Sequence, residues 1–187
     1  EVEPGRLLAI DSGMTTGPID GIATLDPAFG TPAKWIDPVL ASQAEMAGYT
    51  VAEPGAVLAT HLTEVCRRHA DEILTRDATK HLIDELKTTS PAVVDGLIPT
   101  PMSVAEVQGI LQKLLREQVS IRQLGLILET LGDHASRSKD PILLTEYVRH
   151  RLARQICTRY RNAESELYVV ALDPALEDRV RAGFEHT

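Results

Sequence analysis

The sequence predicts an α+β fold, in which small mixed α/β subdomains are followed by a mainly helical subdomain. Short apolar runs separated by Gly- and Pro-rich stretches occupy the first part of the chain, as in strands joined by loops. Beyond residue 75 the apolar residues recur at steps of three and four, as on the buried face of a helix. The composition, 43% hydrophobic but only 4% aromatic, requires an aliphatic core.

The first predicted elements are two strands and the loop between them. Residues 6–10, Arg-Leu-Leu-Ala-Ile, predict a short buried strand, and residues 33–36 predict a second one. Between them, residues 11–32 contain four glycines and three prolines, a density that predicts an extended loop region. A loop of this length inside a compact domain is usually functional or mobile.

A helix, a strand and a second helix follow. Asp37-Pro38 predicts the start of the first helix, because Asp caps free N–H groups and Pro fits the first helical position. Gly48 is placed to end this helix, and residues 49–52 predict a strand. Pro54-Gly55 then begins a long helical pattern.

The next two helical patterns have recognisable ends. Apolar residues at 82, 83 and 86 mark a short helix, and Pro91 breaks the chain after it. Ser103 is the predicted N-cap of the following helix, with Glu106 at the capping-box position.

The C-terminal part is predicted to hold two helices, a strand and a last helix. An apolar stripe over 121–131 is expected to end at Gly132. Asp140-Pro141 repeats the earlier start signal and leads into a helix that continues to residue 156. Residues 167–172 predict a strand, and Asp173-Pro174 begins the final helix.

The net charge of −8 argues against nucleic-acid binding, because a phosphate backbone requires a cationic surface. One local group of arginines departs from this acidic character. It consists of Arg149, Arg151, Arg154, Arg159 and Arg161. We expect a solvated helix face with cations toward its C-terminal end, and a patch for RNA or an acidic partner is the alternative.

The cysteine content suits a cytoplasmic setting, and the ends of the chain suggest a piece of a longer protein. Cys66 and Cys157 are far apart, which argues against a disulfide framework and suits a reducing compartment. The sequence contains no run of about 18 apolar residues and no visible signal peptide. Its first residue is Glu and it stops just after a helical pattern, so we expect a piece of a longer protein.

Signatures of catalysis are weak. The sequence has no P-loop, no Gly-x-Ser-x-Gly elbow and no His-Glu-x-x-His motif. The best metal candidates, His61, Cys66 and His69, share one predicted helix, but His61 lies about 140° around it from Cys66, so the three converge poorly. We therefore expect no catalytic residue, no metal and no cofactor.

Two further enzymatic hypotheses have little support. Asp11, Asp20 and Asp26 could supply an acid/base pair only if the fold gathered them. Cys157 could act as a nucleophile only beside a base, and it is better explained as a small buried apolar residue.

Phe29 is one of two phenylalanines and lies in the Gly/Pro-rich loop. One hypothesis is that it folds back to fill the core. The other is an exposed aromatic anchor beside an acid, an arrangement common in protein-binding hot spots. Periodicity does not separate the two.

Nine short motifs, in this order, resemble the FlhA/SctV family, the export-gate membrane proteins of bacterial type III secretion. They are Gly5-Arg-Leu-Leu-Ala-Ile10, Asp26-Pro-Ala-Phe-Gly30, Ala33-Lys-Trp-Ile36, Ala47-Gly-Tyr-Thr-Val51, Ala59-Thr-His-Leu62, Val119-Ser-Ile-Arg122, Ile127-Leu-Glu-Thr-Leu131, Leu144-Thr-Glu-Tyr-Val-Arg149 and Leu172-Asp-Pro174. The second, seventh and ninth favour the flagellar branch. The chain departs from the family at Thr31, where Leu is more common.

The resemblance implies four regions. Residues 5–53 correspond to an inserted second subdomain with a docking loop, and 54–73 to a remnant of the first. Residues 74–153 correspond to a third, mainly helical subdomain that resembles ring-building motifs, and 154–187 to the start of a truncated fourth.

The resemblance also implies a non-catalytic receptor at the cytoplasmic face of the bacterial inner membrane, with the membrane spans outside this chain. Its partners would be export chaperones with bound flagellar substrates and other components of the export apparatus. The full-length protein would form a homo-oligomeric ring, a nonamer, whereas the fragment alone is compatible with a monomer.

Three site residues carry over from the family's docking cleft. Phe29 would be the apolar anchor, Asp26 a rim charge or hydrogen-bond acceptor that orients the partner, and Thr60 part of the floor of a groove for an amphipathic helix. The alternatives are a virulence-secretion counterpart, a role mainly in ring assembly and a metal-dependent enzyme.

Overall fold

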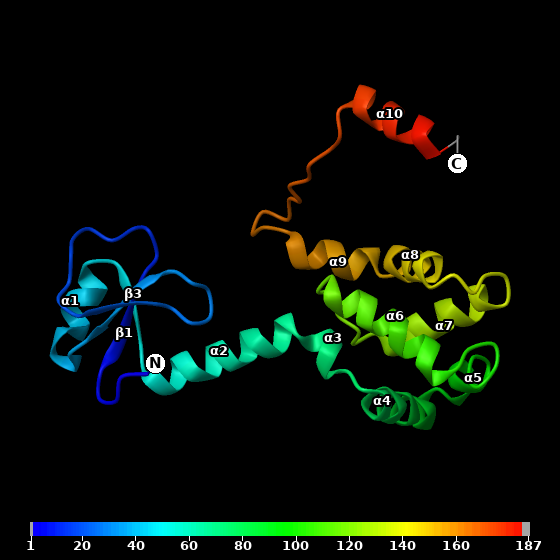
Figure 1. The fold of residues 1–187 in the computed structure, drawn as a ribbon, viewed down its shortest axis with the longest axis horizontal. Coiled ribbons are helices and arrows are strands. Elements are labelled where there is room, and N and C mark those ends of the chain that lie inside the picture. Colours follow the sequence, from blue (N-terminus) through cyan, green and yellow to red (C-terminus); the bar gives the residue numbers. More distant parts are fainter. Residues whose placement is uncertain (1, 185–187) are drawn as a thin grey trace.

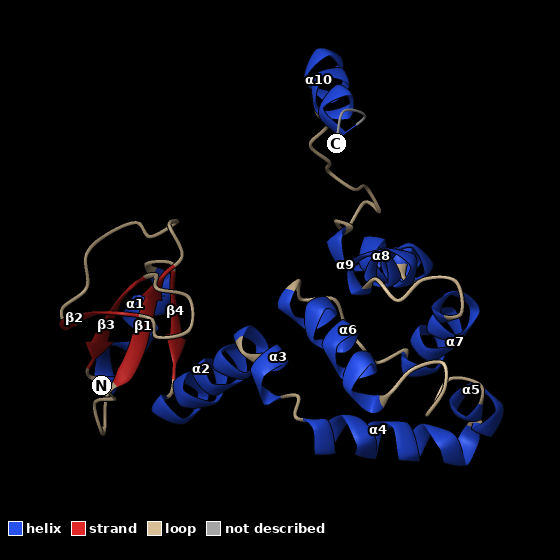
Figure 2. Ribbon diagram, turned by 45° about the vertical axis from the view of Figure 1, so that its right-hand side comes forward, coloured by secondary structure: helices blue, strands red, loops and turns tan. Residues whose placement is uncertain are grey.

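The computed structural model describes residues 2–184 and shows an elongated α+β protein, which confirms the predicted fold class. A sheet unit, residues 7–52, lies at one end and a helical unit, residues 74–160, at the other (Figure 1). The long helix α2, Pro54–Arg68, joins the two units (Figure 2).

The sheet unit contains four antiparallel strands in the order β2-β3-β1-β4. They are β1 (Leu7–Asp11), β2 (Ile22–Leu25), β3 (Pro32–Ile36) and β4 (Tyr49–Ala52). The prediction of an unbroken loop over 11–32 is wrong at β2, because Ile22 pairs with Trp35 and extends the sheet. Gly21 permits this pairing, since an added Cβ there would lie 2.7 Å from the carbonyl oxygen of Trp35.

The two faces of the sheet are covered unequally. On one face α1, Ala41–Met46, packs Ala44 against Ala9 and Ile36. It follows a 3₁₀ turn, Pro38–Leu40, which Asp37 caps by accepting from the N–H of Val39. The chain leaves the helix at Gly48, which has a φ of +88°, as predicted. The other face is covered only by the beginning of α2, so part of it remains open.

The helical unit contains a single large aliphatic core, which extends from Leu74 to Leu152. The following helices build this unit and its connection to α2: α3 (Ala70–Ile73), α4 (Arg76–Thr89), α5 (Pro91–Asp95), α6 (Val104–Arg116), α7 (Leu124–Ala135), α8 (Pro141–Arg151) and α9 (Ala153–Tyr160). Pro91 ends one helical pattern as predicted and also begins α5.

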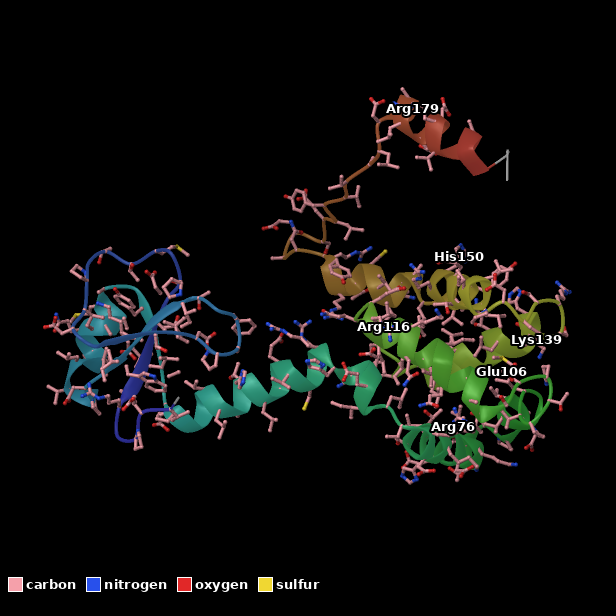
Figure 3. All side chains as sticks on the ribbon, in the orientation of Figure 1. Arg76, Glu106, Arg116, Lys139, His150 and Arg179 are labelled. Atoms are coloured by element: carbon pink, nitrogen blue, oxygen red, sulfur yellow. The ribbon has the colours of Figure 1, made fainter. Side chains whose placement is uncertain are left out.

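The predicted capping box of α6 is confirmed. Ser103 caps the helix, and the side chain of Glu106 accepts hydrogen bonds from the backbone N–H and hydroxyl of Ser103, both at 2.7 Å. These bonds lower the pKa of Glu106, and the nearby charge of Lys139 adds a smaller effect (Figure 3).

The predicted end of α7 at Gly132 is wrong. The helix continues to Ala135, because Leu131 and Ala135 are both fully buried in the core. This packing outweighs the helix penalty of a glycine, about 1 kcal/mol.

The predicted strand at 167–172 is also wrong. These residues have no regular secondary structure and are exposed, with Val170 fully so, and they pair with no strand within the described part of the chain. A strand needs a neighbour to satisfy its N–H and C=O groups, and the segment lies apart from both units (Figure 1). The final helix α10, Pro174–Phe184, follows as predicted.

None of the helices found in residues 2–184 combines the length and the apolar character needed to cross a bilayer.

Candidate functional site

A pocket of about 300 Å³ lies on the open face of the sheet and contains all three site residues that the sequence suggested. The ends of β1 and β4, the loop of residues 26–31 and the first turns of α2 form its walls. Its lining residues are Ile10, Asp11, Ser12, Asp26, Phe29, Thr31, Thr50, Ala52, Ala56, Val57 and Thr60. Aliphatic side chains and methyl groups dominate this set. We call the cavity the Phe29 pocket, after its one aromatic lining residue.

The loop of residues 26–31, here the Phe29 loop, is closed by its own hydrogen bonds. The N–H of Asp26 donates to the carbonyl oxygen of Thr31, and the N–H of Gly30 donates to that of Asp26, both at 2.8 Å. Gly30 has a φ of +72°, a conformation that favours glycine. The loop is therefore a defined turn that projects beyond the β2–β3 pair.

Asp26 shapes this turn from inside. Its side chain is only 5% exposed and accepts hydrogen bonds from the N–H of Phe29 at 3.1 Å and of Ala28 at 3.4 Å. Of the two roles expected for Asp26, an exposed charge on the rim is wrong, because the buried carboxylate accepts from the loop's own backbone. The role of hydrogen-bond acceptor for a partner stays a prediction.

Phe29 lies at the mouth of the pocket, and its side chain is 62% exposed. The hypothesis that it folds back into the core is therefore wrong. A large, exposed aromatic side chain beside an apolar pocket is the arrangement that protein-binding hot spots use.

Thr60 lies on the exposed side of α2, one turn beyond Ala56. Opposite it, Ile10, Thr50 and Ala52 come from neighbouring positions of paired strands, so they share one face of the sheet. The pocket is a cleft between a sheet face and a helix, a shape that can accept an apolar helix face or side chain.

A cluster of charged side chains on α2 contacts the Phe29 loop through Arg68. The side chain of Glu64 is 9% exposed, and its carboxylate accepts two hydrogen bonds from Arg67, at 2.8 and 2.7 Å, and one from Arg68 at 2.8 Å. Hydrogen bonds from Arg67 and then from Arg68 lower the pKa of Glu64 to about 2.

Both arginines also reach beyond α2. Arg68 donates from Nη2 to the carbonyl oxygen of Ala28 at 2.8 Å, inside the Phe29 loop. Arg67 donates from Nη1 to the side-chain oxygen of Gln118, at the end of α6. Glu64 thus orients two arginine side chains, of which Arg68 contacts the sheet unit and Arg67 contacts the helical unit.

The other candidate side chains are not gathered into a site. His61 is half-buried with its Nδ1 unpaired, Cys66 is exposed, and His69 hydrogen-bonds to Glu72. Within residues 2–184 no three His, Cys, Asp or Glu side chains lie close enough to hold a metal ion.

The remaining candidates are spread over the surface. Asp20 is exposed and does not line the Phe29 pocket, although Asp11 and Asp26 do. Cys157 is half-buried, so the interpretation as a small buried apolar residue holds only in part. Within the arginine group, Arg149 pairs with Glu146 and Glu117, and the other four are exposed.

Sequence reasoning missed the sheet side of the pocket and the Glu64 cluster. Alternation along each strand could have shown that Thr50 and Ala52 share a face of β4, and which face of β1 holds Ile10. It could not have shown that these faces of the two strands coincide, because that depends on how the strands pair. Glu64 with Arg67 and Arg68 has the spacing of an intrahelical pair, which alone indicates only a solvated helix face.

The family model described as "FHIPEP family" matches residues 1–187, the whole chain. The Flagellar biosynthesis protein FlhA of Bacillus subtilis (strain 168) is 42% identical over 193 residues, covering 100% of this chain and 28% of that protein. The protein of the same name from Treponema pallidum (strain Nichols) is 47% identical over 176 residues, covering 92% and 25%. The chain therefore spans about a quarter of the length of these relatives.

Solved structures share the fold. The Chlamydia pneumoniae CdsV protein superimposes with a TM-score of 0.80 at 26% identity, over 97% of this chain and 57% of that chain. The Chlamydia pneumoniae CdsV and CdsO protein complex gives 0.78 at 26% identity, over 98% and 55%. Nonameric EPEC SctV-C gives 0.68 at 20% identity, over 100% and 64%.

Proposed function

The chain belongs to the FHIPEP family, and from this premise we propose that it is a docking platform of the flagellar type III export gate. It binds export chaperones with their flagellar substrates, and the Phe29 pocket receives them. The bound partner presents an apolar helix face, Phe29 anchors it, and Thr60 lies beneath it. No catalytic step is part of this function.

One observation carries the proposal. Asp26, Phe29 and Thr60 are separated by up to 34 positions in the chain, yet all three line one pocket. Phe29 remains exposed there instead of filling the core. A large aromatic side chain in water beside an apolar pocket favours binding, because the free energy falls when a partner covers both.

The flagellar branch is favoured over the virulence branch by sequence identity. The chain is 42% and 47% identical to two flagellar relatives and 26% identical to CdsV. A virulence-secretion counterpart is the alternative, and the chaperones that bind would distinguish the two.

We also propose the division into subdomains that the resemblance implied, with boundaries at 5–53, 54–73, 74–153 and 154–187. The sheet unit, α2 with α3, and the large core from Leu74 to Leu152 support the first three boundaries. The fourth boundary, at 154, rests on the resemblance alone.

Further partners and the location follow from the same premise. CdsV was solved in complex with CdsO, which supports our proposal that this chain also binds a further protein partner, a component of the export apparatus. A homo-oligomeric ring at the cytoplasmic face of the inner membrane is our proposal for the full-length protein. The chain alone need not form that ring.

Calorimetric titration with flagellar chaperone–subunit complexes tests the docking function. Phe29→Ala should weaken binding by about 2 kcal/mol or more, roughly thirtyfold, because it removes the aromatic anchor. The matched control is Met46→Ala, which truncates a side chain that is 81% exposed on α1, across the sheet from the pocket. Circular dichroism should show both variants folded.

The outcomes separate the hypotheses. A loss confined to Phe29→Ala supports the pocket. Equal binding by both variants and the wild type places the contact elsewhere on the surface. Binding only by virulence chaperones assigns the chain to the other branch.

A further inference from the structure

Most hydrogen bonds of the Phe29 loop lie within the loop itself. Its internal hydrogen bonds hold the turn together but do not fix where the turn sits over α2. Within residues 2–184, the hydrogen bond that joins its backbone to α2 runs from Arg68 to the carbonyl oxygen of Ala28. Ala28 is 2% exposed, so this carbonyl cannot exchange Arg68 freely for water.

Arg68 is itself held in place. A long arginine side chain on a helix surface loses conformational entropy when it is fixed, unless a second bond orients it. Glu64, one turn earlier on α2, supplies that bond at 2.8 Å through a nearly buried carboxylate. The carboxylate is oriented in turn by the two bonds from Arg67.

From this geometry we infer that Glu64 and Arg68 are positioning residues, which clamp the Phe29 loop to α2 and hold Phe29 over its pocket. The inference rests on the proposed docking function for its consequence, but the clamp itself is a property of the free protein. Neither side chain lines the pocket, so both act through the loop and not by touching the partner.

The second arm of the cluster extends the clamp to the helical unit. Arg67 bonds to Gln118, which has a φ of +59° after α6, and the backbone oxygen of Gln118 accepts from Arg159 of α9. One carboxylate therefore orients the contact to the loop and the contact to the helical unit. The position of Phe29 is linked in this way to the bond between Arg67 of α2 and Gln118 of the helical unit.

Hydrogen–deuterium exchange of the free 187-residue chain tests the clamp. Arg68→Met keeps the aliphatic stem but removes the donors, and Glu64→Gln removes the charge that orients them. Both should raise exchange of amides 26–31 by about tenfold, because local opening becomes easier. Exchange in β1 should not change. Arg68→Lys should restore part of the protection, since its ammonium can still donate to Ala28.

The matched control is Arg137→Met, which removes the same charge from an exposed position after α7. It should leave exchange of the loop unchanged. Unchanged exchange in Arg68→Met would overturn the clamp, and equal increases in loop and β1 would show general destabilisation instead.

A double-mutant cycle tests the consequence for docking. Introduced into the wild-type chain, Arg68→Met should weaken binding of a flagellar chaperone–subunit complex about fivefold. Introduced into Phe29→Ala, the same substitution should weaken binding no further, because the two residues act as one unit. Additive losses would overturn positioning through Phe29. If the wild type binds no such complex, the docking function fails, while the exchange result still decides the clamp.

Discussion

The helical unit and the sheet unit bury apolar side chains to different extents. The helical unit has one continuous core, whereas the sheet unit has two small clusters, one on each face. In the sheet unit the second face is left partly open, and the Phe29 pocket occupies the opening. The comparison teaches that the larger apolar core and the proposed docking surface lie in different units of this molecule.

The largest expected effect is on the core of the helical unit. Leu128→Ala should lower the free energy of unfolding by about 4 kcal/mol, because Leu128 is fully buried in a well-packed core. Leu8→Ala in the sheet unit should cost only about 2 kcal/mol, since its small cluster adjoins an open pocket and can relax.

Urea unfolding followed by two probes measures this difference. Trp35 is the only tryptophan in the sequence and lies in the sheet unit, whereas circular dichroism reports mainly on the helices. Equal costs for the two variants, or coincident changes in both probes, would break the comparison and show a single cooperative unit.

The next effect is on binding alone. Thr60→Tyr should obstruct the Phe29 pocket and weaken docking at least tenfold, or about 1.4 kcal/mol. Thr63→Tyr is the matched control, because Thr63 is also exposed on α2 but does not line the pocket. Calorimetry and melting curves should show a loss of affinity in the first variant without a loss of stability in either. A loss in both variants would argue that the partner covers the whole of α2.

A smaller effect is expected at a helix end in the helical unit. Ser103→Ala should destabilise this unit by about 1 kcal/mol, because the first turn of α6 loses its capping bonds. Docking should not change. If affinity falls together with stability, the recognition surface is not confined to the sheet unit.

The smallest effect is a pH dependence at the junction of the two units. The pKa of Glu64 is lowered to about 2 from an ordinary value of 4.5, so its ion pairs stabilise the fold fully above about pH 4.5. That stabilisation is lost as the pH falls toward 2. The melting temperature of the wild type should exceed that of Glu64→Gln at pH 7 and converge with it near pH 2. A constant difference between pH 7 and pH 2 would contradict this assignment.

Local signals in the sequence were sufficient for most elements. Asp37, Ser103 and Asp140 each cap a helix as predicted, because a cap depends on side chains within three residues of the helix start. The predictions that failed depended on distant partners. β2 forms because β3 is beside it, and 167–172 remains unpaired because no strand in the described part of the chain accompanies it.

The candidate site shows the same division. Phe29 and Thr60 were chosen by family resemblance, and the fold brings them to one pocket. Pattern alone left the exposure of Phe29 open and gave no warning that Asp26 is buried. The bond from Arg68 to Ala28 spans 40 positions in the chain, so no local rule could have suggested it.

The single helix between the two units also has a mechanical consequence. An α-helix of 15 residues such as α2 is about 22 Å long and resists bending. The helix meets the helical unit at α3, and the sheet unit lies at its other end. Because α2 is stiff, a rotation of about 10° about α3 would carry the far end of the helix, and the sheet with it, through about 4 Å.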